Sequence, residues 1–198
     1  MRMLENFLVR LPKRFKDTIK VNGQELYLDP KFDEFQHRVM QGEVVSVPMR
    51  YEKVAEPGDT LYFHHHVVMD KGQGLRYNDE EIFIVRYHPD TPYASQAFAV
   101  KDEDGIRVLS QWVLLEPIKE DNQLKSDTIQ IISFEEEENK RGKIAFINET
   151  LEEAGLRVGD TVGFSKNSDY EIEIEGKKYW RMRFDDLLYV EIEEVHDA

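Results

Sequence analysis

The chain contains Gly42-Glu43-Val44-Val45-Ser46-Val47, followed by Pro57-Gly58-Asp59-Thr60-Leu61-Tyr62-Phe63. The same pair recurs as Gly142-Lys143-Ile144-Ala145-Phe146-Ile147, followed by Val158-Gly159-Asp160-Thr161-Val162-Gly163-Phe164. The first segments are offset by 100 residues and the second by 101. Segments that keep their order, spacing and chemistry indicate an internal duplication, so the sequence predicts two domains.

The secondary-structure pattern is that of an all-β protein. Short runs of β-branched and aromatic residues end at Gly, Pro, Asn or Asp. Helix signals are confined to Asp33–Met40 and to one turn at Glu149–Ala154. The predicted strands of the first repeat are Phe7–Leu11, a hairpin over Thr18–Leu28, Gly42–Val47, Thr60–Val68, Glu81–Tyr87, Ala97–Lys101, Ile106–Leu109 and Trp112–Leu115. Those of the second repeat are Thr128–Phe134, Gly142–Asn148, Thr161–Ser165, Tyr170–Glu175, Lys178–Arg183 and Leu187–Ile192.

The repeat sets the predicted domain limits. Gln111–Glu116 matches Asp186–Glu191 at an offset of 75, as if both were closing strands. This match predicts a first domain over residues 1–118, a polar linker over 119–127 and a shorter second domain over 128–198. It also predicts a long loop over 13–41 and an insertion near 67–95 in the first domain. The second domain is expected to replace the loop by the charged connection 135–141.

Composition excludes several classes of function. The 198 residues are 40% hydrophobic, enough for packed cores, and include no cysteine, which excludes disulfides and thiolate sites. The net charge of −14 repels phosphate backbones and argues against nucleic acid as a partner. The basic residues among the first twenty are interpreted as a solvated strand end. No apolar run approaches the length of a membrane span and no signal peptide is visible, so we expect no membrane partner and a cytoplasmic location.

The order of these motifs resembles the GroES-type co-chaperonin family, also called chaperonin-10. The best stretch runs from Arg141-Gly142-Lys143-Ile144 through the Val158-Gly159-Asp160 turn to Asp186-Leu187-Leu188-Tyr189-Val190-Glu191, and the first repeat follows it less closely. The resemblance implies two tandem Greek-key, partly open β-barrels. It also implies a non-enzymatic protein without cofactors, which forms a homo-oligomeric ring or lid on a chaperonin and assists protein folding. The long loops are similar to those of virus-encoded, for example phage, co-chaperonins, which would place the protein in the host cytoplasm.

In that family a loop between the first strand and the Gly-Glu-Val strand binds the chaperonin through a short apolar tripeptide. The resemblance therefore implies Leu26, Tyr27 and Leu28 as the contact, within the loop 13–41. Strand alternation equally allows Leu26 and Leu28 to face a core. The alternative function is then a structural or virion-assembly protein that keeps the fold without binding a chaperonin.

His64-His65-His66 is the main candidate for metal chemistry. On a strand, His64 and His66 share a face while His65 points away, which could hold a metal with a third ligand. The expected interpretation is a polar strand face, with no metal bound. An enzyme or metal protein built on His64 and His66 is the third hypothesis.

Overall fold

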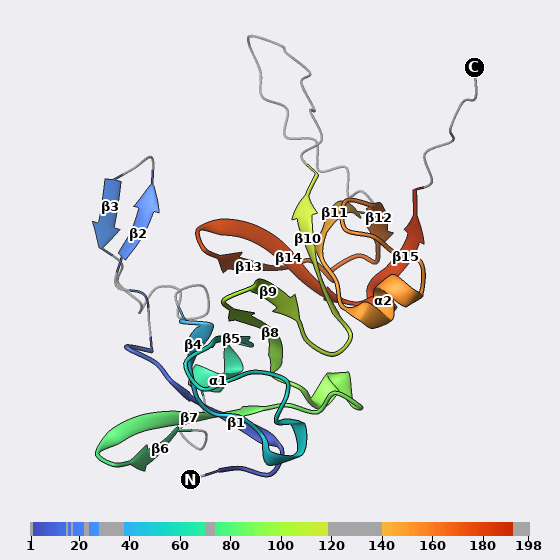
Figure 1. Ribbon diagram of the computed structural model, residues 1–198. Coiled ribbons are helices and arrows are strands. Elements are labelled where there is room, and N and C mark those ends of the chain that lie inside the picture. The colour runs from blue at the N-terminus through green and yellow to red at the C-terminus, as the bar shows by residue number, and fades with distance from the viewer. Residues whose placement is uncertain are drawn as a thin grey trace, which may run out of the picture. The chain divides into compact units, whose positions relative to one another are not determined.

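The computed structural model describes residues 2–14, 16, 18–21, 24–27, 38–69, 74–118 and 140–191 (Figure 1). The chain divides into a first unit, Met1–Ser110, and a second unit, Gln111–Ala198. The elements of the first unit are β1 (Asn6–Arg10), β2 (Thr18–Val21), β3 (Gln24–Tyr27), β4 (Gln41–Ser46), η1 (Met49–Tyr51), β5 (Thr60–Phe63), α1 (His66–Met69), β6 (Gly74–Tyr77), β7 (Glu80–Arg86), η2 (Pro92–Ala94), β8 (Ala97–Asp102) and β9 (Gly105–Val108). Those of the second unit are β10 (Trp112–Pro117), β11 (Lys140–Phe146), α2 (Glu149–Glu153), β12 (Thr161–Phe164), β13 (Tyr170–Ile174), β14 (Lys177–Arg183), η3 (Phe184–Asp186) and β15 (Leu187–Val190).

Each unit is built on one antiparallel sheet, and the two sheets have the same strand order. The first runs β6-β7-β1-β4-β5-β8-β9, and the second runs β13-β14-β10-β11-β12-β15. Strand by strand, β1 corresponds to β10, β4 to β11, β5 to β12, the hairpin β6–β7 to β13–β14, and β8 to β15. The first sheet has one strand more, because β9 pairs with the edge of β8. The predicted all-β class, with few helices, is confirmed.

Irregularities in the sheets also correspond. The pairing of β1 with β4 shifts between Leu8 and Val9, and that of β10 with β11 shifts between Leu114 and Leu115. The pairing of β5 with β8 shifts at Tyr62/Phe63, and that of β12 with β15 shifts at Gly163/Phe164. Because each bulge adds one residue to one strand and bends it, two bulges at matching places give both sheets the same local bends.

The repeated Gly-Asp turns explain why that motif occurs twice. Gly58 and Gly159 have φ values of 101° and 99°, in the region that side chains disfavour. The carboxylate of Asp59 accepts a hydrogen bond from the Glu56 N–H at 2.8 Å, and Asp160 accepts one from the Arg157 N–H at the same distance. Glycine therefore permits the turn and aspartate closes it, just before the strands β5 and β12.

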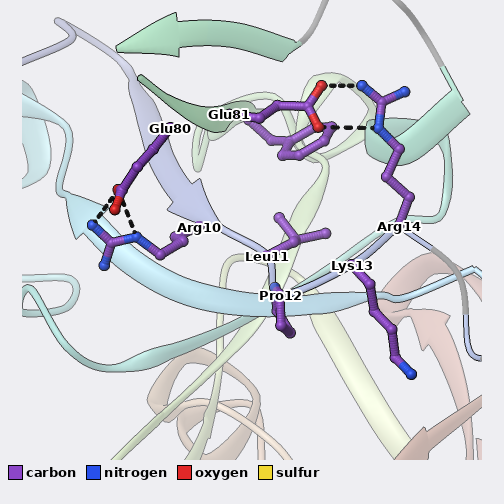
Figure 2. A pocket seen from close by; sticks show the side chains of 8 residues that line it. Arg10, Leu11, Pro12, Lys13, Arg14, Glu80 and Glu81 are labelled. Atoms are coloured by element: carbon purple, nitrogen blue, oxygen red, sulfur yellow. Dashed lines mark hydrogen bonds and ion pairs between the residues drawn. The ribbon is translucent and has the colours of Figure 1, made fainter. Parts of the chain in front are cut away.

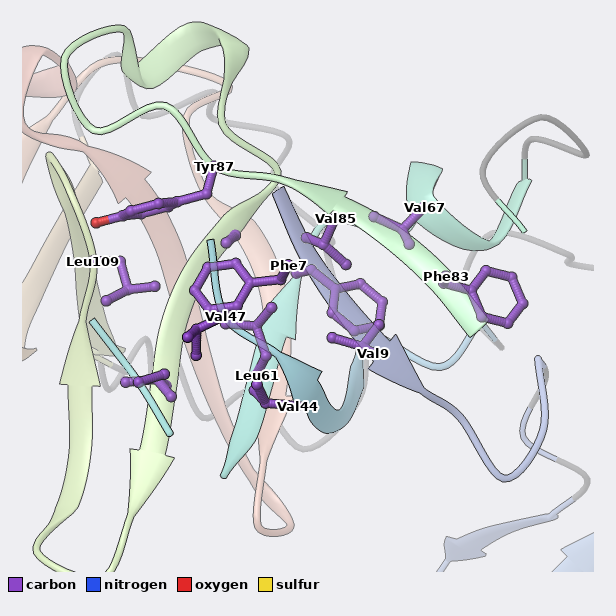
Figure 3. Close-up of a cluster of buried hydrophobic side chains, with 14 of the residues drawn as sticks. Phe7, Val9, Val44, Val47, Leu61, Val67, Phe83, Val85, Tyr87 and Leu109 are labelled. Atoms are coloured by element: carbon purple, nitrogen blue, oxygen red, sulfur yellow. The ribbon is translucent and has the colours of Figure 1, made fainter. Parts of the chain in front are cut away.

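The two cores occupy matching positions. Figure 3 labels Phe7, Val9, Val44 and Leu61 of the first core. Together with Phe63 of the same core, they correspond to Val113, Leu115, Ile144, Val162 and Phe164 of the second. In each case two strands alternate a residue that faces this core with a residue on the opposite face of the sheet. The side chains differ in size, but the same strands present them to the core.

Several sequence expectations need correction. Trp112–Pro117 is not the closing strand of the first unit, because it pairs with β11 and β14 at the centre of the second sheet. The boundary therefore lies at Ser110/Gln111 rather than at 118, and the second domain does not begin at 128. The predicted linker 119–127 and strand Thr128–Phe134 lie outside the described residues. The strand matching Leu187–Val190 is β8, not Gln111–Glu116.

The predicted insertion 67–95 is also divided. The β6–β7 hairpin inside it has a counterpart in β13–β14, and the extra length lies in the connections on either side, residues 64–73 and 87–96. The strand predicted over Thr60–Val68 ends at Phe63, where the chain turns into α1.

The helical turn predicted at Glu149–Ala154 is confirmed by α2. The side chain of Asn148, which precedes this helix, accepts a hydrogen bond from the Leu151 N–H. Arg38–Met40 is not helical, and the rest of Asp33–Met40 lies outside the described residues. No helix of the described residues is both long and apolar enough to cross a membrane.

Candidate functional site

The connection between β1 and β4 returns close to the point where it leaves the first sheet. The Val39 N–H donates a hydrogen bond to the Arg14 carbonyl at 3.0 Å, which ties the two ends of the connection together. Within it, β2 and β3 form a hairpin in which Thr18 faces Tyr27 and Ile19 faces Leu26. Among the described strands, these two pair only with each other. The hairpin expected from the sequence is thus present within a connection whose two ends are held together by the Arg14–Val39 hydrogen bond.

The predicted contact residues that the structure describes are exposed. Leu26 is 46% exposed and Tyr27 is 90% exposed, and Leu28 lies outside the described residues. Neighbouring residues of a strand point to opposite faces, so apolar surface is available on both faces of the hairpin. For Leu26 this exposure contradicts the alternative in which it faces a core.

The base of the connection carries Arg10 and Arg14, two of the basic residues among the first twenty, and both form ion pairs with glutamates (Figure 2). Arg10 donates to one oxygen of Glu80 from Nε and Nη2 at 3.0 and 2.8 Å, and to Glu43 from Nη1 at 3.2 Å. The hydrogen bond to Glu80 is the largest cause of the raised pKa of Arg10. Arg14 binds Glu81 through both ends of its guanidinium fork. The shallow pocket between these pairs is therefore no site for an anion, and the interpretation as a solvated strand end holds.

The second unit has a connection in the same topological place. Residues 118–139 join β10 to β11, as residues 11–40 join β1 to β4. All but Ile118 lie outside the described residues, and their sequence includes Ile129, Ile131 and Ile132. Of the charged connection 135–141 expected for the second repeat, residues 135–139 lie outside the described residues, while Lys140 and Arg141 belong to β11. That expectation rested on assigning β10 to the first domain. One signal pointed the other way: both first strands are apolar runs that stop at a proline, Pro12 and Pro117.

The aromatic and basic strand Lys177–Arg183 does not form a stacking surface for nucleic acid. Arg181 is only 5% exposed, and its guanidinium lies 4.4 Å from the ring centre of Trp112 and 4.6 Å from that of Tyr170. Desolvation by burial lowers the pKa of Arg181 to about 10. Trp180 packs on the second core, edge-to-face with Phe164. These side chains are used for packing, in agreement with the net negative charge.

The edges of the two sheets differ in exposure. Leu188, Tyr189 and Val190 of β15 are 55%, 41% and 38% exposed, whereas the matching β8 residues Ala99 and Val100 are fully buried. In the first sheet β9 covers the outer edge of β8, and among the described residues no strand covers β15. The second sheet therefore ends in an apolar edge strand.

The histidine triplet does not lie on a strand: His64 and His65 are in the turn after β5, and His66 is the first residue of α1. One ring nitrogen from each of His64, His65 and His66 lies within 4.8 Å of the others. The expectation that His65 points away from its neighbours is corrected, because the chain leaves the extended conformation after Phe63.

Comparison with known proteins identifies the family. Residues 105–190 match the model of the family described as "Chaperonin 10 Kd subunit". Two relatives named co-chaperonin GroES, from two strains of Porphyromonas gingivalis, are each 38% identical to the chain over 87 residues. Those residues make up 43% of this chain and 98% of each relative. The family match covers the second unit, and nearly all of the first unit lies outside it. The chain therefore belongs to the chaperonin 10 family of co-chaperonins, which is not a family of enzymes.

Proposed function

We propose that this protein is a co-chaperonin that caps a chaperonin ring and assists protein folding. The observation that carries the proposal is the pair of exposed apolar residues, Leu26 and Tyr27, on a hairpin at the end of a closed connection. Such a segment can dock into an apolar groove of a partner while its own sheet stays intact. Membership of the co-chaperonin family supports a chaperonin as the partner.

We also propose that the two units arose by tandem duplication of one co-chaperonin domain. The common strand order, the two matching bulges and the two matching Gly-Asp turns support this. Each chain then supplies two co-chaperonin units to an assembly. The proposed contacts are Leu26, Tyr27 and Leu28 in the first unit, and the apolar residues Ile131 and Ile132 of the connection 118–139 in the second.

The exposed strand β15 supports a homo-oligomer. An edge strand with an apolar face is a template for pairing with another chain. In the first unit β9 fills this place from within the chain, and in the second unit a strand of another copy would fill it. A head-to-tail contact of this kind repeats around a ring, as a lid on a chaperonin requires.

The test is co-migration of the purified chain with a chaperonin ring in the presence of ATP. We expect a complex for the wild type and at least about thirtyfold weaker binding for Leu26→Asp/Tyr27→Asp, the loss typical of central interface residues. Ile131→Asp/Ile132→Asp measures the second contact. Tyr93→Asp is the matched control, because Tyr93 is 65% exposed and lies outside both connections. If the wild type forms no complex, the proposal fails.

A structural or assembly role without chaperonin binding is the second candidate. It is favoured by the regular pairing of β2 with β3, since an ordered hairpin departs from the flexible docking loop that the family resemblance implies. A closed oligomer that does not co-migrate with the chaperonin in the same experiment would support this role. A cytoplasmic location and a viral origin stay predictions.

A further inference from the structure

The turn that holds the three histidines is fixed by the first unit's core. The His64 N–H donates to the Gln96 carbonyl at 2.9 Å, while the His64 and His65 carbonyls accept from the Val67 and Val68 N–H groups at 3.0 and 3.2 Å. The Val67 and Val68 side chains are 0% and 2% exposed. The backbone beneath the imidazoles is therefore anchored, and only the rings need to move when a ligand arrives.

The rings form one cluster at the surface of the unit. Their centres are 4.2 Å apart for His64 and His65, and 4.3 Å apart for the other two pairs. His65 is buried, His64 is half-buried and His66 is exposed. Met69, one turn along α1, brings its Sδ atom to 3.1 Å from His66 Nδ1. Three imidazoles thus lie together, with the Met69 thioether beside His66. The exposed His66 leaves the cluster accessible to an ion from solvent.

We infer that this cluster, His64, His65, His66 and Met69, binds a single copper ion. Nitrogens that share one ion at about 2.1 Å lie roughly 3.4 Å apart in a tetrahedral site, and the three ligand nitrogens already lie within 4.8 Å. Imidazole suits copper, zinc and nickel, and a thioether selects Cu(I) among them. In the described part of the chain no carboxylate joins the group, which disfavours harder ions.

Binding requires one rearrangement that the structure identifies. The rings of His64 and His66 are stacked, with 22° between their planes, so their in-plane lone pairs lie in two nearly parallel planes. The exposed His66 ring has to rotate to aim a nitrogen at the ion held by its neighbours. If the ion takes His64 Nδ1, it also replaces the long hydrogen bond of 3.3 Å that this atom accepts from the His66 N–H. Both changes are local to the turn.

The site is independent of the proposed chaperonin contact. It lies outside residues 105–190, which match the family, and the equivalent connection of the second unit, Ser165–Asp169, contains no histidine. Copper binding can therefore succeed or fail whatever the outcome of the chaperonin experiment.

The test uses the full chain without an affinity tag, titrated with Cu(I) against a chromophoric chelator under reducing conditions. We expect one ion per chain for the wild type and none for His64→Gln/His66→Gln. Met69→Leu should weaken Cu(I) binding about tenfold or more and leave Zn²⁺ binding unchanged. His88→Gln is the control, because His88 lies beside Glu5, at 3.8 Å, away from the triplet in sequence. If the wild type and the double variant bind Cu(I) equally, the histidines do not form the site. If Met69→Leu binds Cu(I) as tightly as the wild type, the assignment of copper as the metal is wrong.

Thermal unfolding provides a second readout that separates lost binding from lost folding. An ion that binds only the folded chain raises its Tm. We expect Cu(I) to raise the Tm of the wild type but not that of the double variant, while the two metal-free proteins unfold at similar temperatures. A Tm that rises equally in both proteins would contradict the inference.

Discussion

At the scale of single residues, the two units place a tyrosine on opposite members of the same cross-strand pair. On β5, Tyr62 lies opposite Ala99 of β8, whereas on β12 Gly163 lies opposite Tyr189 of β15. A Cβ atom added at Gly163 would lie 2.2 Å from the Tyr189 ring. Each cross-strand pair thus contains one tyrosine and one small residue, on alternate strands. The two residues of each cross-strand pair therefore constrain each other's size, so neither can be changed independently of its partner.

This arrangement predicts a coupled pair of substitutions. Gly163→Ala should destabilise the second unit by about 1 kcal/mol or more, because the tyrosine ring has to leave its place over the strand. Tyr189→Ala removes the ring, so adding Gly163→Ala to it should cost little. Denaturant unfolding of both single variants and the double variant measures the coupling. Strict additivity of the two changes would contradict the packing shown by the structure.

The motif glycines were predicted as markers of a repeat, and the structure gives their physical reason. A Cβ at Gly42 would lie 2.9 Å from the Arg10 carbonyl oxygen, and one at Gly142 would lie 2.9 Å from Leu115 Cδ1. In both units the strand that carries the glycine passes too close to the preceding first strand for any side chain. The sequence pattern located these positions correctly, although it could not say what they approach.

At the scale of elements, the strand Trp112–Pro117 shows where the sequence stops being informative. Its apolar run predicts a buried strand, which is confirmed, but alternation does not say which sheet the strand joins. Pairing with Ile144 and Met182 in the second sheet is non-local information. Assigning the strand to the first repeat hid the connection 118–139 and so half of the candidate contact surface. The strand predicted through the histidines was wrong for a different reason. The sequence His-His-His-Val-Val is compatible with a strand, but the chain turns into α1, where Val67 and Val68 are buried, and the strand ends at Phe63.

The central place of β10 predicts how the chain can be divided. A fragment of residues 111–198 keeps β10 between β11 and β14 and should fold alone. A fragment of residues 119–198 lacks the strand that joins them, together with buried Val113, Leu114 and Leu115, and should stay unfolded. Near-ultraviolet circular dichroism and amide dispersion in NMR spectra distinguish the two. Equal folding of both fragments would show that β10 is dispensable to the second sheet.

At the scale of the whole molecule, the proposed duplication would leave one apolar sheet edge of this kind unpaired among the described strands, rather than two. The edge of β8 is paired with β9 inside the chain, while β15 exposes Leu188, Tyr189 and Val190. On this proposal, a single-domain co-chaperonin would need one contact between chains for every unit, whereas this chain would supply one of every two such contacts internally through β9. An assembly with a given number of units would then need half as many contacts between chains. Each remaining contact would matter more to the stability of the assembly.

The edge of β15 is therefore the place where one substitution should dissociate the assembly. Leu188→Lys places a charge on the exposed strand, the means by which natural edge strands avoid pairing. We expect light scattering to show a closed oligomer for the wild type and mainly single chains for the variant. Val158→Lys is the matched control, since Val158 is 60% exposed in the same unit but lies in a turn. If Leu188→Lys keeps the wild-type mass, another surface holds the chains together. If Val158→Lys dissociates them as well, added charge rather than the edge is responsible. Dissociation by Leu188→Lys alone, with unchanged thermal unfolding of the second unit, would assign the contact between chains to β15.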